Sequence, residues 1–95
     1  MVDAPALRLQ QTCPAHDNKV WSLSWHHGGN LVATGSSDKL IKIWGRQADG
    51  TFTHKSTLDG GHTKTIRCVT WKPGCKVGSL CLASSSFDAT ACIWL

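Results

Sequence analysis

The side chains most able to do chemistry in this 95-residue sequence are five cysteines, Cys13, Cys68, Cys75, Cys81 and Cys92. Their odd number and irregular spacing, with no CxxC pair, do not fit the even, dense framework of a secreted disulfide-rich domain. Cys13 and His16 have two residues between them and could begin a metal site, but no second pair follows at zinc-like spacing. We therefore expect reduced cysteines, with Cys81 and Cys92 packed as small apolar side chains, and no bound metal or cofactor.

Composition and charge exclude several classes of function. Hydrophobic residues make up 41% of the chain and charged residues 17%, which indicates a globular fold and not a disordered segment. The formal net charge is +4, but the Lys and Arg residues are scattered and no two are adjacent, so a nucleic-acid surface is not expected. No apolar stretch approaches the ~20 residues of a membrane helix, and the first ten residues lack the apolar core of a signal peptide. These features predict a cytoplasmic protein.

Two stretches of the chain, fifty residues apart, carry the same pattern. TGSSDKLIKIWG (34–45) and SSSFDATACIWL (84–95) each place an Asp six positions before a Trp. A second match aligns His16 with His62 at an offset of 46 residues. The offset changes from 46 to 50 within residues 72–79, whose Pro, Gly and Lys content indicates a loop. A length change confined to a loop is typical of a true structural repeat.

Each copy is expected to consist of short β-strands. No segment shows helical periodicity over twelve residues, whereas β-rich runs recur between polar or glycine-bearing turns. A period of 46 to 50 residues that holds four strands is the period of a propeller blade, so the predicted class is all-β. The predicted strands are 19–25, 31–36, 39–44, 51–58 (an edge strand), 65–71, 80–86 and 90–94.

The order of residues within each copy resembles that of the WD-repeat β-propeller family. A His is followed by an apolar strand that ends in an aromatic residue, then by small residues, an Asp and finally Ile-Trp. GGH (60–62) resembles the Gly-His element of the family, and PAH (14–16) is a weaker form of it. Gly45 and Leu95 stand where an Asp often follows the Trp, a position that is variable in the family. The resemblance implies an incomplete propeller, with two blades of a ring of about seven.

The resemblance also implies how the chain is divided. Residues 1–15 would be an N-terminal segment whose LRLQQT run (7–12) supplies the strand that closes the ring. Residues 16–58 would form the first blade, and residues 59–95 the second blade, truncated before its outer strand. Because two blades cannot close a ring, we expect this chain to be the N-terminal piece of a longer protein.

In the WD-repeat family each blade is held by a buried hydrogen-bond network, and the residue types it needs occur twice here. The Trp indole would donate to a hydroxyl, the hydroxyl would contact a His ring, and the ring would contact a carboxylate. A hydroxyl, a His and an Asp could also suggest a hydrolase, but their occurrence in both copies beside a Trp favours structure, so no catalytic residue is expected. The resemblance assigns the two sets to His16, Thr34, Asp38 and Trp44, and to His62, Ser84, Asp88 and Trp94.

The resemblance further implies that partner proteins dock on the top face, built from the start of each inner strand and the residue before each turn Asp. Arg67 interrupts an otherwise apolar strand, and Phe87 occupies a tight polar turn. Both residues could belong to the scaffold, or Trp21, Arg67 and Phe87 could form one binding patch, since aromatic residues and Arg are enriched at hot spots. The predicted top-face residues are Lys19, Trp21, Ser37, Thr65, Arg67 and Phe87.

Three stretches, 31–45, 61–74 and 86–94, narrow the resemblance to the WD-repeat proteins of cytosolic iron–sulfur assembly. It implies a non-catalytic adapter of the targeting complex that delivers clusters to cytosolic and nuclear apoproteins, located in the cytoplasm and also in the nucleus. The implied partners are the other subunits of that complex and its apoprotein clients, with no nucleic acid, membrane or small-molecule substrate. The scattered cysteines are not expected to hold the clusters, whose ligands are closely grouped thiolates. A scaffold of another complex, an enzyme and a fragment unable to fold alone remain as alternatives.

Overall fold

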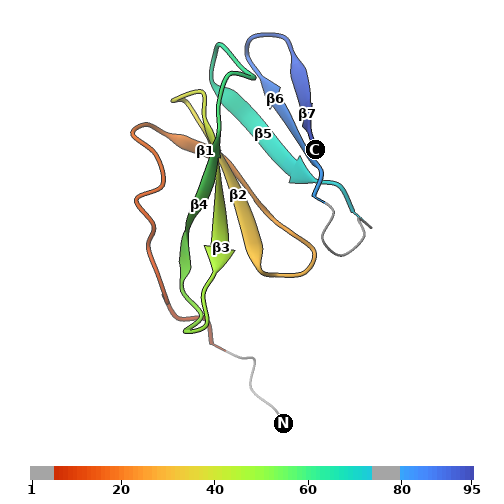
Figure 1. Ribbon diagram of the computed structural model, residues 1–95. Coiled ribbons are helices and arrows are strands. Elements are labelled where there is room, and N and C mark those ends of the chain that lie inside the picture. Colours follow the sequence, from red (N-terminus) through yellow and green to blue (C-terminus); the bar gives the residue numbers. More distant parts are fainter. Residues whose placement is uncertain (1–5, 74–79) are drawn as a thin grey trace.

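The computed structural model describes residues 6–73 and 80–95. These residues form seven β-strands and no helix, arranged as two antiparallel sheets that lie side by side (Figure 1). The all-β prediction is therefore confirmed. In these two ranges no helix is long and apolar enough to cross a membrane. The first sheet has the order β1 (Val20–Trp25), β2 (Leu31–Ser36), β3 (Ile41–Arg46) and β4 (Phe52–Leu58), and the second has β5 (Ile66–Trp71), β6 (Leu82–Ser86) and β7 (Ala91–Trp94).

The strand after each turn Asp begins one or two residues later than predicted, because a turn occupies its first residues. In the first copy Lys39 has a left-handed φ of 73°, and the Asp38 carboxylate accepts a hydrogen bond from the Leu40 N–H at 3.0 Å. The second copy repeats this turn at Asp88, where Ala89 has a φ of 69°. An extended strand can begin only after the chain leaves this left-handed conformation.

The length difference between the two copies lies in the loop after each inner strand. In the first copy the His26 N–H donates to the Leu31 carbonyl at 2.9 Å, and in the second the Lys72 N–H donates to the Cys81 carbonyl at 2.8 Å. The two bonds join equivalent positions, so the predicted insertion lies between Lys72 and Cys81. Part of this loop, including Cys75, is outside the described residues.

The two sheets meet where β1 and β2 contact β5, and the buried core residues come from β2, β3, β5 and β6. Gly35 in β2 permits this close approach, because a Cβ atom there would lie only 2.7 Å from Cγ2 of Ile66. Burial of apolar surface between the sheets is the main source of their attraction. The buried core consists of Ala33, Ile41, Ile43, Ile66, Val69, Trp71 and Leu82.

The N-terminal segment runs along the first sheet, on the side away from the second sheet (Figure 1). Residues 6–16 contain no strand, so the strand predicted over 7–12 is not formed here, and its role in ring closure stays a prediction. The Gln11 side chain instead pairs with the backbone of Phe52, donating to its carbonyl at 2.7 Å and accepting from its N–H at 2.8 Å. A groove of about 620 Å³ separates this segment from β1 and β2.

Candidate docking face and the networks that position it

The first hydrogen-bond network joins the segment before β1 to β2, β3 and the turn between them. The His16 ring, fully buried, lies 2.8 Å from Asp38 Oδ2 through Nδ1 and 2.8 Å from Thr34 Oγ1 through Nε2. The Trp44 indole donates to the same hydroxyl at 3.0 Å. With the hydroxyl accepting from the indole, it can donate to Nε2, which leaves Nδ1–H to donate to the carboxylate. The structure thus brings all four residues of this set together.

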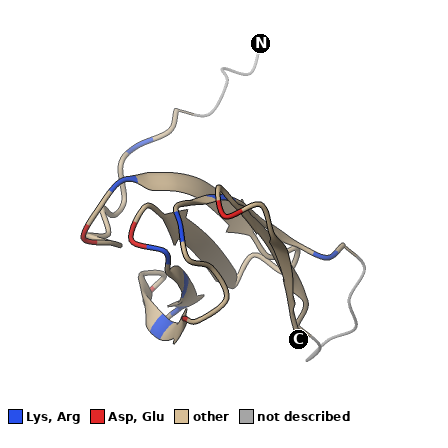
Figure 2. Ribbon diagram, turned by 90° about the horizontal axis from the view of Figure 1, so that it is seen from above, with Lys and Arg blue, Asp and Glu red and all other residues tan. Residues whose placement is uncertain are grey.

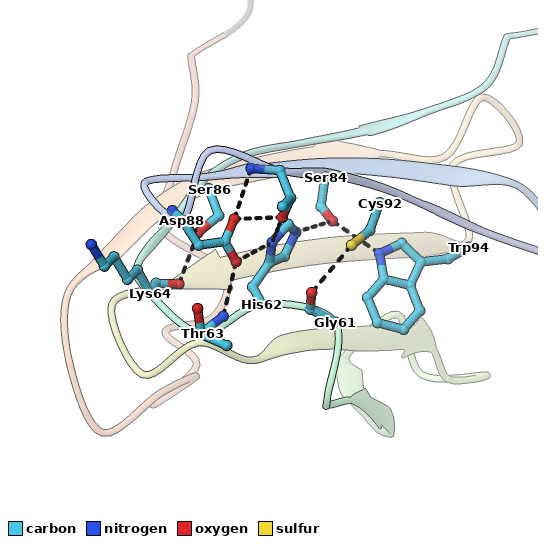
Figure 3. Close-up of polar contacts among 10 residues, drawn as sticks. Gly61, His62, Thr63, Lys64, Ser84, Ser86, Asp88, Cys92 and Trp94 are labelled. Carbon is cyan, nitrogen blue, oxygen red and sulfur yellow. Dashed lines mark hydrogen bonds and ion pairs between the residues drawn. The ribbon is translucent and has the colours of Figure 1, made fainter.

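The second network repeats the first in the second sheet. His62 Nδ1 lies 3.1 Å from Asp88 Oδ2, His62 Nε2 lies 2.8 Å from Ser84 Oγ, and the Trp94 indole donates to Ser84 Oγ at 2.9 Å. Figure 3 shows the His62 ring between Asp88 and Ser84, with Trp94 beyond Ser84. The Asp88 carboxylate also accepts from the Thr63 N–H at 2.9 Å. The predicted residues of the second set are therefore also brought together.

Hydrogen bonds lower the pKa of both network carboxyl groups. For Asp88 the Thr90 hydroxyl has the largest effect, burial acts in the opposite direction, and the backbone N–H groups of Thr63 and Thr90 help to hold the pKa well below its usual range. For Asp38 burial raises the pKa, but hydrogen bonds from Leu40 N–H and His16 outweigh it and the pKa is lowered. Both carboxylates therefore stay charged at neutral pH and act as fixed acceptors.

The geometry of the two networks favours a structural role over catalysis. Ser84 is 3% exposed and Thr34 is 5% exposed, so both side chains are largely shielded from a substrate. Each hydroxyl also accepts an indole N–H, which occupies one of its two lone pairs. The networks join the turn Asp to the lead-in of the inner strand, next to the predicted top-face residues.

Two β-bulges lie at predicted top-face residues. The pairing of β1 with β2 shifts register between Val20 and Ser22, and the pairing of β5 with β6 shifts between Ile66 and Cys68. The extra residues at these shifts are Trp21 and Arg67, which occupy equivalent positions in the two copies. A bulge kinks the strand and turns the extra side chain away from the regular faces of the sheet.

Three predicted top-face residues meet across the boundary between the sheets. The Arg67 guanidinium carbon lies 4.3 Å from the centre of the Trp21 ring and 5.1 Å from the centre of the Phe87 ring. Trp21 is 46% exposed and Phe87 is 60% exposed, so both rings remain accessible to a partner. We name this cluster of Trp21, Arg67 and Phe87 the seam patch. Contacts of a cation with two aromatic faces hold its members together.

The other predicted top-face residues support the seam patch from beside it. The Trp21 indole donates to Ser37 Oγ at 2.6 Å, and the Ser37 N–H donates to the Lys19 carbonyl at 2.9 Å. In the second copy the Phe87 N–H donates to the Thr65 carbonyl at 3.1 Å. These bonds tie each turn to the start of its inner strand.

Sequence reasoning missed several polar residues that shape these networks. Ser36 and Ser86 accept a hydrogen bond from the N–H of the turn Asp in their own copy, each at 3.1 Å, and their equivalence at an offset of 50 could have revealed them. Thr63 and Thr90, which bond Asp88, have no counterpart of the same type in the first copy. No repeat signal could therefore have identified these two threonines.

The described residues offer no metal centre and no single basic surface. No group of three or more His, Cys, Asp or Glu side chains within 6–73 and 80–95 is placed to hold a metal ion. Both ring nitrogens of His16 are bonded to other side chains, so it cannot join Cys13 in a metal site. Seen from above, the basic residues lie on separate strands and loops (Figure 2).

Comparison with known proteins identifies the family. Residues 7–45 and 52–94 match the family described as WD domain, G-beta repeat. A probable cytosolic iron–sulfur protein assembly protein of Culex quinquefasciatus is 42% identical over 88 residues, which cover 93% of this chain and 25% of that relative. Similarly named relatives from Schistosoma japonicum and Botryotinia fuckeliana are each 39% identical over 93% of this chain, and 24% and 21% of their own lengths are covered.

The chain therefore spans about a quarter of the length of the curated relatives it matches. The matched ranges include both hydrogen-bond networks and all three residues of the seam patch. The sequence-based interpretation as two blades of a propeller agrees with the family match and with the two sheets. This chain belongs to the WD-repeat family.

Proposed function

We propose that residues 1–95 are part of a non-catalytic WD-repeat adapter in cytosolic iron–sulfur protein assembly. The observation that carries this proposal is the similarity, over more than nine-tenths of the chain, to proteins whose names assign them to that process. In this proposal the adapter is a subunit of a targeting complex that delivers clusters to apoproteins in the cytoplasm and nucleus. The cluster is the cargo of that complex and is not bound by this chain.

The proposed division of the chain follows from its repeats. Residues 16–58 form the first blade and residues 59–95 form the second, and residues 7–12 within the segment 1–15 close the ring. The remaining blades of a ring of about seven belong to the full-length protein. The apolar groove beside β1 supports this arrangement, because Val20, Leu23 and Trp25 line it and are exposed in the absence of a neighbouring blade.

Partner binding is proposed to occur at the top face, through the seam patch. Two large exposed rings and an arginine, held together without cover, have the composition of a binding hot spot. Lys19, Ser37 and Thr65 would border the interface. The proposed partners are the other subunits of the targeting complex and its apoprotein clients, with no nucleic acid, membrane or small-molecule substrate.

The proposal excludes an enzymatic role for this chain. In both hydroxyl–histidine–aspartate sets the hydroxyl is buried and accepts a hydrogen bond from a tryptophan indole. The occurrence of the same set in both copies fits a repeated structural role. The family match supports an adapter of this kind.

Depletion of the full-length protein in cells tests the proposed process. The activity of a cytosolic iron–sulfur enzyme should fall, the activity of a mitochondrial iron–sulfur enzyme should be unchanged, and re-expression of the wild-type protein should restore the first. Unchanged maturation of cytosolic and nuclear iron–sulfur enzymes in depleted cells would contradict the proposal. That result would favour a WD-repeat scaffold of another complex.

A further inference from the structure

The Arg67 side chain carries a charge that no carboxylate in the described residues neutralises. Asp38 and Asp88, the two turn carboxylates nearest the top face, contact His16 and His62 in the networks and not Arg67. An arginine is always protonated in a protein and presents its N–H donors as a planar fork. Its charge at this position is therefore available to a partner.

The Trp21 and Phe87 rings hold the Arg67 guanidinium in place before any partner binds. The Trp21 ring is itself held by its 2.6 Å bond to Ser37, and both Trp21 and Arg67 project from bulges in paired strands. A side chain that is ordered before binding loses less rotamer entropy when the partner arrives. The seam patch is thus organised in advance around the donors of Arg67.

The lead-in segments beside the seam patch carry exposed charged side chains. Lys19 and Lys64, both exposed, lie just before the two inner strands, and Asp17 is the acidic residue among them. The Lys64 carbonyl accepts from the Ser86 hydroxyl at 3.0 Å, which keeps this segment beside the turn that carries Phe87. An approaching partner therefore meets exposed cationic side chains, while the Asp38 and Asp88 carboxylates are largely buried.

We propose that the seam patch binds a carboxylate side chain of an acidic peptide segment in a partner protein. Arg67 donates to both oxygens of that carboxylate, and the exposed Trp21 and Phe87 rings cover the apolar atoms of the same segment. A bidentate arginine–carboxylate pair gives geometric selectivity as well as attraction. This inference rests on the proposed docking face and names the chemistry that the face recognises.

Binding of a tetraglutamate peptide to the full-length protein tests the inference, with tetraglutamine as the neutral counterpart. Tetraglutamate should shift the Nε–H resonance of Arg67 in a saturable titration, and tetraglutamine should not. Arg67→Gln should weaken tetraglutamate binding about fivefold or more, and Arg67→Lys, which keeps the charge but loses the planar fork, should also weaken it.

Arg46→Gln is the matched control, because it removes the same charge from an exposed residue at the far end of β3. Equal weakening by Arg46→Gln and Arg67→Gln would overturn the inference, since net charge alone would then explain binding. Equal binding of the two peptides by the wild-type protein would also overturn it.

If Arg67→Gln lowers capture of the assembly partners but leaves tetraglutamate binding unchanged, the carboxylate inference is wrong and the docking face stands. Loss of tetraglutamate binding with unchanged capture of partners supports the carboxylate site and contradicts the docking face.

Discussion

The indole nitrogen of Trp71 lies 3.0 Å from the backbone oxygen of Ser24, so the second blade donates a hydrogen bond directly to the inner strand of the first. A second bond, from the Val69 N–H to Ser22 Oγ at 3.1 Å, crosses the same boundary. These two bonds hold β5 against β1 in one register, and the packing of Ile66 on β2 adds apolar contact. The position of the seam patch depends on this register, because its members come from both blades.

Replacing Trp71 with Phe should weaken the boundary between the blades. Trp71 is 7% exposed, and the change removes its donor and leaves the Ser24 carbonyl without this partner. We expect the free energy of unfolding of the full-length protein to fall by about 1–3 kcal/mol in chemical denaturation. Trp21→Phe, which removes an indole donor at an exposed position, should cost less than about 1 kcal/mol. Equal losses would show that the buried bond has no special importance.

Removal of a network residue should destabilise the full-length protein by about 2–4 kcal/mol, because it leaves buried partners without a hydrogen bond. This applies to His62→Ala and to Asp88→Ala, each of which breaks the contact between the two side chains. Lys39→Ala, at an exposed turn position, should cost under about 0.5 kcal/mol. Similar effects for all three variants in denaturant titrations would mean that the networks have been assigned the wrong role.

The lowered pKa values of Asp38 and Asp88 predict a stability that depends on pH in the acid range. A carboxyl group whose pKa is lower in the folded state stabilises fully above its unfolded pKa, and this contribution is lost as the pH falls towards the folded pKa. The contribution of both groups should therefore be constant from about pH 7 to 5 and decrease below about pH 4. The Asp88→Asn variant lacks the contribution of the Asp88 carboxylate. The difference in free energy of unfolding between this variant and wild type should therefore narrow below about pH 4. A difference that persists unchanged to about pH 2 would contradict the lowered pKa of Asp88.

Residues 1–95 in isolation should lack a cooperative unfolding transition. The groove beside β1 exposes Leu23 and Trp25, and in a ring each blade buries such a face against its neighbour. The isolated chain should bind a hydrophobic dye, whereas the full-length protein should unfold cooperatively and bind little dye. Cooperative unfolding of monomeric residues 1–95 would show that these two blades do not need further neighbours.

The repeat made much of the fold and the candidate site predictable from sequence. Two copies at offsets of 46 and 50 place equivalent side chains at equivalent points of a blade, which is why His16 and His62 could be aligned without a structure. The residues of the seam patch were predicted from the resemblance to the WD-repeat family, and Trp21 and Arg67 occupy equivalent positions in the two copies. The repeat thus carries information about which positions share a face.

Several backbone contacts and one turn were not predictable from the sequence. Ser24 contributes a backbone oxygen to its bond with Trp71, and any residue type could supply that atom. Gln11 bonds the backbone of Phe52 across 41 positions of sequence, with no repeat to indicate it. The late start of β3 was missed because Lys39 is not a residue type that usually adopts a positive φ.

Capture of the iron–sulfur assembly partners by the full-length protein is the most direct test of the proposed adapter function. Arg67→Ala and Phe87→Ala should each weaken capture by about 1–3 kcal/mol in quantitative pull-down titrations, because both remove part of the seam patch. The midpoint of unfolding should stay nearly unchanged, since both side chains are exposed. Arg46→Ala, a matched change at the opposite end of the first blade, should leave capture unaffected. Undiminished capture by the folded Arg67→Ala, Phe87→Ala double variant would contradict partner binding at the seam patch. These residues would then have a structural role only.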